Sequence, residues 1–148
     1  MRDLKGALDI LVRGLAGPRI GSERTKGRGG SLARVLIADD EPDIRFMMRV
    51  ILEGAGYSVT EARHGAAGLK SAKASHPDLV TTDVMMPTMD GLELIERLRS
   101  DPKTAGIPIL VVSGNSELGA GANARLPKPF TRRELLHAAA LLIREDGG

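Results

Sequence analysis

Short apolar runs and helical patterns alternate five times from residue 34 onward, and this alternation limits the fold more than any other feature of the chain. Residues 35–38 (VLIA), 79–82 (LVTT) and 109–112 (ILVV) lack polar alternation, which is typical of strands covered on both faces of a parallel sheet. Residues 57–62 and 124–127 are weaker strand candidates. A repeated strand–helix order requires right-handed crossovers, so the sequence predicts an α/β fold with an open, doubly wound, five-stranded parallel sheet.

Helix signals lie between and after these strands. Pro42 suits the first position of a helix, and an apolar stripe at helical spacing follows it as far as Gly54, which predicts a helix over residues 42–54. Residues 65–74 are rich in Ala and Gly and are predicted to be helical, with His64 helping to begin the helix. Two further helices are each expected to open on a capping residue followed three positions later by an acid, Asp90 with Glu93 and Thr131 with Glu134.

Length and composition fit one globular domain with a tail. The 148 residues are 42% apolar but only 2% aromatic, so the core is expected to be aliphatic. The absence of cysteine excludes disulfides, thiolate zinc sites and cysteine nucleophiles, and it is compatible with a reducing cytoplasm, which is the location we expect. No apolar run approaches the roughly 20 residues that a transmembrane helix needs, and the N-terminus lacks the hydrophobic stretch of a secretory signal.

Charge is divided unevenly along the chain. Residues 1–34 carry eight Lys or Arg and three acids, a net charge of +5, whereas the remaining residues carry thirteen and sixteen, a net charge of −3. We therefore expect a basic N-terminal extension over residues 1–33, with a short amphipathic helix at 3–16 and a flexible linker, rich in Gly, Ser and cations, at 17–32. The folded domain is expected over residues 34–146.

Ionic and polar side chains follow four of the five predicted strands. Asp39 and Asp40 follow the first strand and Asp83 the third, while Ser113 and Lys128 lie at the ends of the fourth and fifth. In doubly wound folds the site lies at the carboxyl ends of the central strands, where the strand order reverses, so these side chains are expected to converge. Carboxylates about 4 Å apart repel one another by roughly 4 kcal/mol at an effective dielectric near 20, so a cation must hold them together.

The donor types at this predicted site indicate which cation it holds. An all-oxygen cluster without His or Cys suits a hard ion, and Mg²⁺, which keeps waters and accepts carboxylates and a phosphate oxygen, suits it best. Asp39 and Asp40 are adjacent and are expected to share the metal. Asp83 stands alone and is the expected phosphoacceptor, because a carboxylate can act as a nucleophile and form an acyl phosphate. Lys128 would pair with the phosphoryl group, and the Ser113 hydroxyl could bond it.

Four segments resemble, in order, the signature segments of response-regulator receiver domains. They are VLIADDEPDIR (35–45), DVMMPTMDG (83–91), PILVVSG (108–114) and LPKPF (126–130), and the resemblance covers roughly residues 34–145. It implies a flavodoxin-like sheet with strand order 2-1-3-4-5. It also implies an acidic metal-binding pair at Asp39 and Asp40, and an Asp83 that is both the phosphoacceptor and a Mg²⁺ ligand. The backbone carbonyl of Met85 would be a further Mg²⁺ ligand, and Ser113 and Lys128 would be the phosphoryl-sensing hydroxyl and lysine.

The resemblance further implies the biological role. A histidine kinase or histidine phosphotransfer protein would supply the phosphoryl group, and the domain would catalyse only its own phosphorylation and dephosphorylation. Because no effector follows Gly148, we expect a single-domain response regulator. Its output would be a phosphorylation-dependent contact with another, unidentified protein or phosphorelay transfer, and a homodimer is possible.

The sequence departs from the family pattern in two places. The interval from Ser113 to Lys128 is shorter than is usual in the family, so the helix between the fourth and fifth strands is expected to be short or absent. The position three before the lysine, commonly Tyr or Phe in the family, is Arg125, which leaves open whether the usual aromatic switch operates.

Two alternative functions remain open. The first is a Mg²⁺-dependent aspartyl-phosphate phosphatase, although such enzymes usually place a second acid two residues after the nucleophile, where this chain has Met85. The second is a nucleic-acid or membrane-surface binder that acts through the basic residues 1–33 and is regulated by the domain. Nucleic acid is not the partner we expect first, because such tails are more often merely solvated.

Overall fold

The structure is a computed structural model that describes residues 32–114 and 121–147. The predicted helix at 3–16 and nearly all of the predicted linker at 17–32 lie outside these residues. The described part of the chain alternates strands and helices in the following order: β1 (Arg34–Ala38), α2 (Pro42–Gly54), β2 (Ser58–Ala62), α3 (Gly65–Ser75), β3 (Leu79–Thr82), α4 (Gly91–Ser100), β4 (Ile109–Ser113), β5 (Ala124–Pro127) and α5 (Arg132–Gly147).

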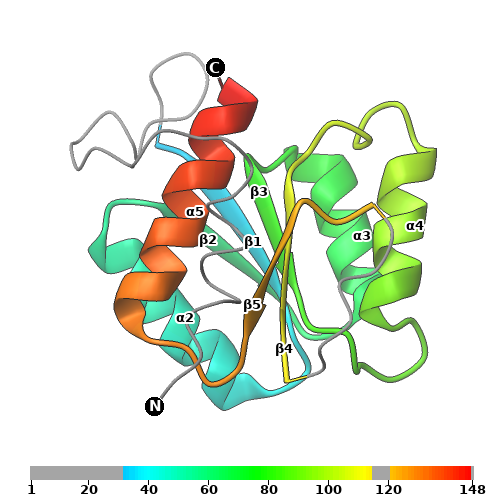
Figure 1. Ribbon diagram of the computed structural model, residues 1–148. Coiled ribbons are helices and arrows are strands. Elements are labelled where there is room, and N and C mark those ends of the chain that lie inside the picture. The colour runs from blue at the N-terminus through cyan, green and yellow to red at the C-terminus, as the bar shows by residue number, and fades with distance from the viewer. Residues whose placement is uncertain (1–31, 115–120, 148) are drawn as a thin grey trace.

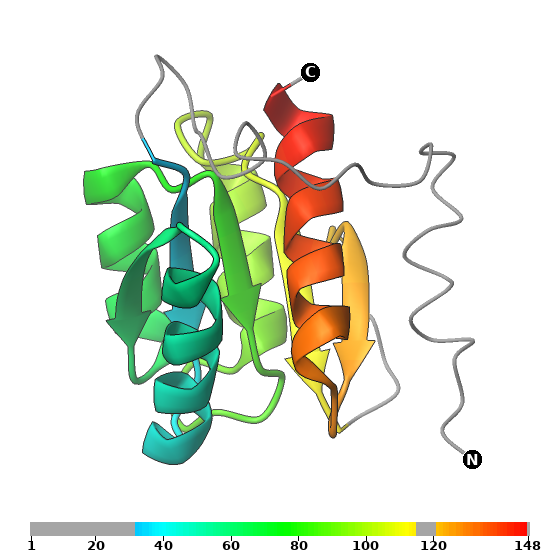
Figure 2. The same ribbon diagram turned by 90° about the vertical axis from the view of Figure 1, so that its left-hand side faces the viewer.

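The five strands form one parallel sheet in the order β2-β1-β3-β4-β5, which confirms the predicted doubly wound fold and its strand order. Helices α2 and α5 cover one face of the sheet, and α3 and α4 cover the other (Figure 1, Figure 2). From β1 the chain winds outward to β2 and then returns to the opposite side of β1 as β3. The strand order therefore reverses between β1 and β3, and this is where a doubly wound fold places its site.

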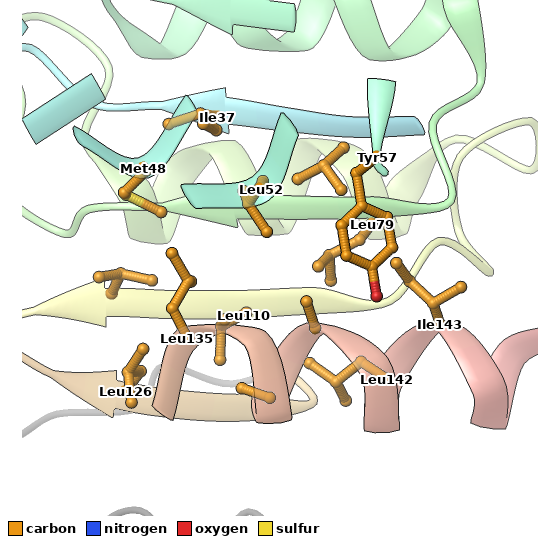
Figure 3. Close-up of a cluster of buried hydrophobic side chains, with 14 of the residues drawn as sticks. Ile37, Met48, Leu52, Tyr57, Leu79, Leu110, Leu126, Leu135, Leu142 and Ile143 are labelled. Atoms are coloured by element: carbon orange, nitrogen blue, oxygen red, sulfur yellow. The ribbon is translucent and has the colours of Figure 1, made fainter. Parts of the chain in front are cut away.

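The central strands are buried along their whole length. Every residue of β3 and β4 is buried, and these residues are apolar apart from Thr81, Thr82 and Ser113. On one face, side chains of the sheet pack against α2 and α5 in a cluster of aliphatic residues joined by Tyr57 (Figure 3). On the other face, a second cluster packs against α3 and α4. With so few aromatic residues, the core is aliphatic, as the composition predicts.

The helices begin at the predicted capping residues. The side chain of Asp90 accepts a hydrogen bond of 2.9 Å from the backbone N–H of Glu93. Thr131 and Glu134 form a reciprocal pair, in which each side chain accepts the other residue's backbone N–H, at 3.1 and 2.8 Å. His64 caps α3 through Nδ1, which accepts the backbone N–H three residues further along the chain at 3.1 Å. These local bonds fix the loops that precede α3, α4 and α5.

The connection between β4 and β5 contains no helix in its described residues, Gly114 and 121–123, while residues 115–120 lie outside the description. Arg99 of α4 anchors its far end by donating to the backbone oxygen of Gly121 and to Oδ1 of Asn123, both at 2.8 Å. The same guanidinium donates to two carbonyls of the α4–β4 loop, those of Ala105 and Ile107. One side chain thus ties α4 to the loops on both sides of β4.

Candidate functional site

The predicted site residues meet at the carboxyl ends of the strands. Asp39 directly follows β1 and Asp83 directly follows β3, and these two strands are neighbours across the point of strand reversal. Ser113 is the last residue of β4, and Lys128 directly follows β5. Because all four strands are parallel, their carboxyl ends lie at one edge of the sheet. The expected convergence is present for Asp39, Asp83 and Lys128, whereas Asp40 is exposed and lies outside the cluster.

Lys128 joins the acidic side chains of this edge. Its Nζ lies 3.0 Å from Oδ2 of Asp39, 3.2 Å from Oδ2 of Asp83 and 3.3 Å from Oε1 of Glu41. Burial lowers the pKa of Lys128, but the hydrogen bonds and charges of Asp39 and Asp83 outweigh burial and leave the pKa above its ordinary value. The lysine is therefore a full positive charge, set against three carboxylates.

Asp39 is the most buried of the three acids, with 2% of its surface exposed. Its Oδ1 accepts the backbone N–H of Glu41 at 2.9 Å, and its Oδ2 faces Lys128. Burial raises the pKa of Asp39, and the charge of Asp83 raises it further, while the backbone bond and Lys128 compensate only in part. Since one ammonium faces three carboxylates, a second cation would balance more of their negative charge.

Asp83 presents its two oxygens to different partners. Oδ1 accepts the backbone N–H of Val84 at 2.7 Å and lies 3.4 Å from the backbone nitrogen of Met85, whereas Oδ2 faces Lys128. The Met85 side chain is 69% exposed, so only the backbone of this residue lies against the carboxylate. The backbone therefore sets the direction of the Asp83 carboxylate before any ligand binds.

Three carboxylates of the described residues can share one metal ion. Asp39, Glu41 and Asp83 each offer an oxygen, and these oxygens lie within 4.8 Å of one another. The donor set is entirely oxygen, which fits a hard cation such as Mg²⁺ with waters completing its coordination. Asp40 is exposed and does not belong to this group, so its predicted role as a ligand stays a prediction.

Glu41 is a member of the site that the sequence reasoning missed. It occupies the N-cap position of α2, but its side chain makes no capping hydrogen bond and reaches Lys128 instead. A signal was present in the sequence, because Glu is not among the residues favoured at an N-cap and here it directly precedes Pro42 at the first helical turn.

Ser113 and Arg125 lie on the neighbouring strands β4 and β5. Ser113 is 2% exposed, and its backbone oxygen accepts the N–H of Lys128 at 3.0 Å, so the two residues are adjacent across the sheet. Arg125 is half-buried and pairs with Val111 in the strand register. The position that is commonly aromatic in the resembling family is thus held by a cation in the middle of β5.

A doubly wound parallel sheet with clustered carboxylates and a lysine at its point of reversal defines a class of small α/β domain whose ligand site lies at this edge of the sheet. Within that class, residues 35–140 match the family model of the response regulator receiver domain, and the chain belongs to this family. Receiver domains are signalling components of two-component systems rather than classical enzymes. They bind Mg²⁺ in an acidic pocket and interact with histidine kinases or phosphotransfer proteins.

Curated relatives are longer than this chain. It is 38% identical over 123 residues to the DNA-binding dual master transcriptional regulator RpaA of Synechocystis, covering 78% of this chain and 51% of RpaA. It is 40% identical over 118 residues to the response regulator MprA of Mycolicibacterium vanbaalenii, covering 75% of this chain and 50% of MprA. The chain therefore spans about half the length of the curated relatives it matches.

Solved structures of similar proteins match over nearly their whole length. The chemotaxis response regulator CheY4 of Vibrio cholerae has a TM-score of 0.72 and 31% identity, covering 76% of this chain and 99% of CheY4. The receiver domain of a sensor histidine kinase from Pseudomonas aeruginosa, solved with a magnesium ion in its active site cleft, has a TM-score of 0.72 and 27% identity, covering 76% and 98%. Within the described part of this chain, no helix is long and apolar enough to cross a membrane.

Proposed function

We propose that Asp83 accepts a phosphoryl group from a histidine kinase or histidine phosphotransfer protein in a Mg²⁺-dependent reaction. The observation that carries this proposal is the contact of one ammonium, Lys128 Nζ, with Asp39, Glu41 and Asp83. Such a cluster gathers the acids that can hold a divalent cation next to a carboxylate that is already oriented by the backbone. The deficit of positive charge favours uptake of the metal.

In the proposed reaction, Oδ2 of Asp83 attacks the phosphorus of a phosphohistidine. Oδ1 is held by the backbone N–H of Val84, whereas the Lys128 ammonium that faces Oδ2 can pair with the incoming phosphoryl group. The new oxygen–phosphorus bond forms as the phosphorus–nitrogen bond breaks, and the electron pair of that bond returns to the imidazole nitrogen. Asp39, Glu41 and Asp83 would hold the Mg²⁺, with Asp40 and the carbonyl of Met85 as the further ligands expected from the family. When bound, the metal would supply positive charge to the phosphoryl oxygens during transfer.

Lys128 and Ser113 are the proposed readers of the acyl phosphate. Phosphorylation replaces one negative charge on Asp83 with about two and adds acceptor oxygens, so the Lys128 ammonium gains a stronger partner. The hydroxyl of Ser113, at the end of the adjacent β4, would bond the same group and shift the β4–β5 connection that follows it. The output is a contact with a further protein or phosphorelay transfer, and a homodimer is one form that such a contact could take.

The structure bears differently on the two alternative functions. Nothing in the site favours the phosphatase, since the second acid it needs is replaced by Met85 with an exposed side chain. The second alternative, a nucleic-acid or membrane-surface binder acting through residues 1–33, depends on residues that lie mostly outside the part of the chain that the structure describes. It is tested by deleting residues 1–30 and measuring retention on DNA or anionic vesicles. A cytoplasmic location also stays a prediction from the sequence.

The proposed phosphorylation is tested with acetyl phosphate and Mg²⁺, with mass spectrometry as the readout. We expect the wild type to gain one phosphoryl group only when Mg²⁺ is present, and Asp83→Asn to gain none. Asp90→Asn is the matched control, because Asp90 is an exposed aspartate of the same loop that caps α4 and touches neither the lysine nor the cluster. Equal labelling of wild type and Asp83→Asn would refute the assignment of Asp83.

A further inference from the structure

Arg45 connects the acidic loop, residues 39–41 between β1 and α2, to strand β2 at the edge of the sheet. It lies on α2, one turn after Pro42, and its side chain is only 15% exposed. Its Nη1 donates to the backbone oxygen of Asp39 at 2.7 Å, and its Nε donates to Oε1 of Glu61 at 2.9 Å. A half-buried guanidinium therefore bridges the residue that follows β1 and a carboxylate of β2.

Glu61 is itself held in place from the same helix. Its second oxygen accepts a hydrogen bond of 2.7 Å from Nη1 of Arg49, which also pairs with Glu53 at 3.1 Å. Arg45 and Arg49 are one helical turn apart and share Glu61, but of the two only Arg45 donates to the acidic loop. The Glu61 carboxylate thus aims the Arg45 guanidinium, because its other oxygen is already fixed.

The carbonyl that Arg45 contacts belongs to the peptide bond between Asp39 and Asp40. The N–H of Asp39 is fixed by the backbone oxygen of Ala62 at 3.1 Å, and the Asp39 side chain is fixed by Glu41 and Lys128. The bond from Arg45 adds the orientation of the Asp39–Asp40 peptide plane, which joins the Cα atoms of these two residues and leads on to Glu41. Groups that orient the ligands of a metal in this way commonly change its affinity by about 10- to 100-fold when they are removed.

We propose that Arg45 is a positioning residue of the Mg²⁺ site, aimed by Glu61 so that the Asp39–Asp40 peptide holds the acidic side chains ready for the metal. This inference rests on the proposed function, because it assumes that the acidic cluster binds Mg²⁺. A purely structural role for Arg45 would be to join α2 to β2. Arg49 makes that same connection without touching the loop, so the chain supplies its own matched control.

The test is a Mg²⁺ titration followed by NMR or calorimetry, together with thermal unfolding, on wild type, Arg45→Gln, Arg45→Lys and Arg49→Gln. We expect the dissociation constant for Mg²⁺ to rise about 10-fold in Arg45→Gln. It should rise less in Arg45→Lys, which retains a donor and a charge, and least in Arg49→Gln, which loosens Glu61 but leaves the bond from Arg45 to the Asp39 carbonyl in place. Both glutamine variants lose a bond to Glu61, so both should lower the melting temperature.

Three outcomes would overturn the inference. Wild-type affinity in Arg45→Gln refutes the positioning role alone, and so does an equal loss of affinity in Arg45→Gln and Arg49→Gln. If Arg45→Gln does not fold, Arg45→Lys decides the matter, since it must bind Mg²⁺ more weakly than the wild type. Absence of Mg²⁺ binding by the wild type would instead refute the proposed function, and the inference with it.

Discussion

A methyl group added at Gly91 should displace the proposed phosphoacceptor. Gly91 is the first residue of α4, and a Cβ at this position would lie 2.0 Å from the backbone oxygen of Asp83 and 2.9 Å from the Cα of Val84. Both neighbours are backbone atoms, so no flexible side chain can yield. The N–H of Gly91 also donates to the backbone oxygen of Val84 at 2.8 Å, which keeps the two segments together.

The size of the effect of Gly91→Ala follows from this geometry. Real Cβ contacts are essentially never shorter than 3.0 Å, so the Asp83 carbonyl and the start of α4 must separate by about 1 Å. Overpacking of this kind typically costs about 1–3 kcal/mol of unfolding free energy. A misplacement of about 1 Å at a reacting group can slow a reaction by on the order of 100-fold.

The assays are urea denaturation and the rate of Mg²⁺-dependent phosphorylation by acetyl phosphate. Gly54→Ala is the control, because a Cβ at the end of α2 would meet nothing within 4 Å. That variant should gain about 0.5 kcal/mol of stability and keep the wild-type rate. If Gly91→Ala is as stable and as rapidly phosphorylated as the wild type, the close packing of α4 against the Asp83 loop is refuted.

Three further predictions concern stability. The buried Thr81 hydroxyl has no hydrogen-bond partner in the described part of the chain, so Thr81→Val should raise the unfolding free energy by about 1 kcal/mol in denaturant titrations; an unchanged or lower value would contradict this. Arg99→Ala leaves the loop acceptors around β4 without their donor, so it should lower the unfolding free energy by about 2–3 kcal/mol. The control is Arg97→Ala, which should be nearly neutral because its guanidinium pairs with Glu93 on the helix surface. Burial raises the pKa of Glu61, but Arg49 and Arg45 outweigh burial and lower the pKa overall. The ion pairs of Glu61 therefore stabilise the fold above its ordinary pKa of 4.5, and this stabilisation is lost as the pH falls through the lowered pKa. The stability advantage of the wild type over Glu61→Gln should therefore shrink as the pH falls below 4.5, and an advantage that grows on acidification would contradict the ion pairs.

Much of the fold could be predicted because its local signals agree with its layers. Strands β3 and β5 begin and end at the predicted residues. Strand β3 is a short run of apolar and β-branched residues, whereas β5 (ARLP) carries a weaker signal. The meeting of Asp39, Asp83 and Lys128 also followed from the sequence, because parallel strands bring their carboxyl ends to one edge.

The remainder depends on contacts that leave no periodic pattern. Glu41 joins the site because its side chain makes no capping bond and is free to reach Lys128. The geometry of the loop decides that direction, and the sequence pattern does not encode it. The bonds of Arg45 and Arg99 go to backbone oxygens of other segments, and any residue type supplies such an acceptor. Sequence spacing therefore cannot show which arginine is structural and which is merely solvated.

The most direct test of the account is whether the acidic cluster takes up magnesium. A Mg²⁺ titration of the wild type, followed by NMR, should saturate and should perturb the amides of Asp39, Glu41, Asp83 and Lys128 together. Asp39→Asn removes a buried carboxylate that belongs to the cluster and should abolish saturation, whereas Asp78→Asn, at a carboxylate that bonds the backbone of Arg34 and lies outside the cluster, should not. A wild type that shows no saturable response to Mg²⁺, or an Asp39→Asn variant that binds as the wild type does, would contradict the account.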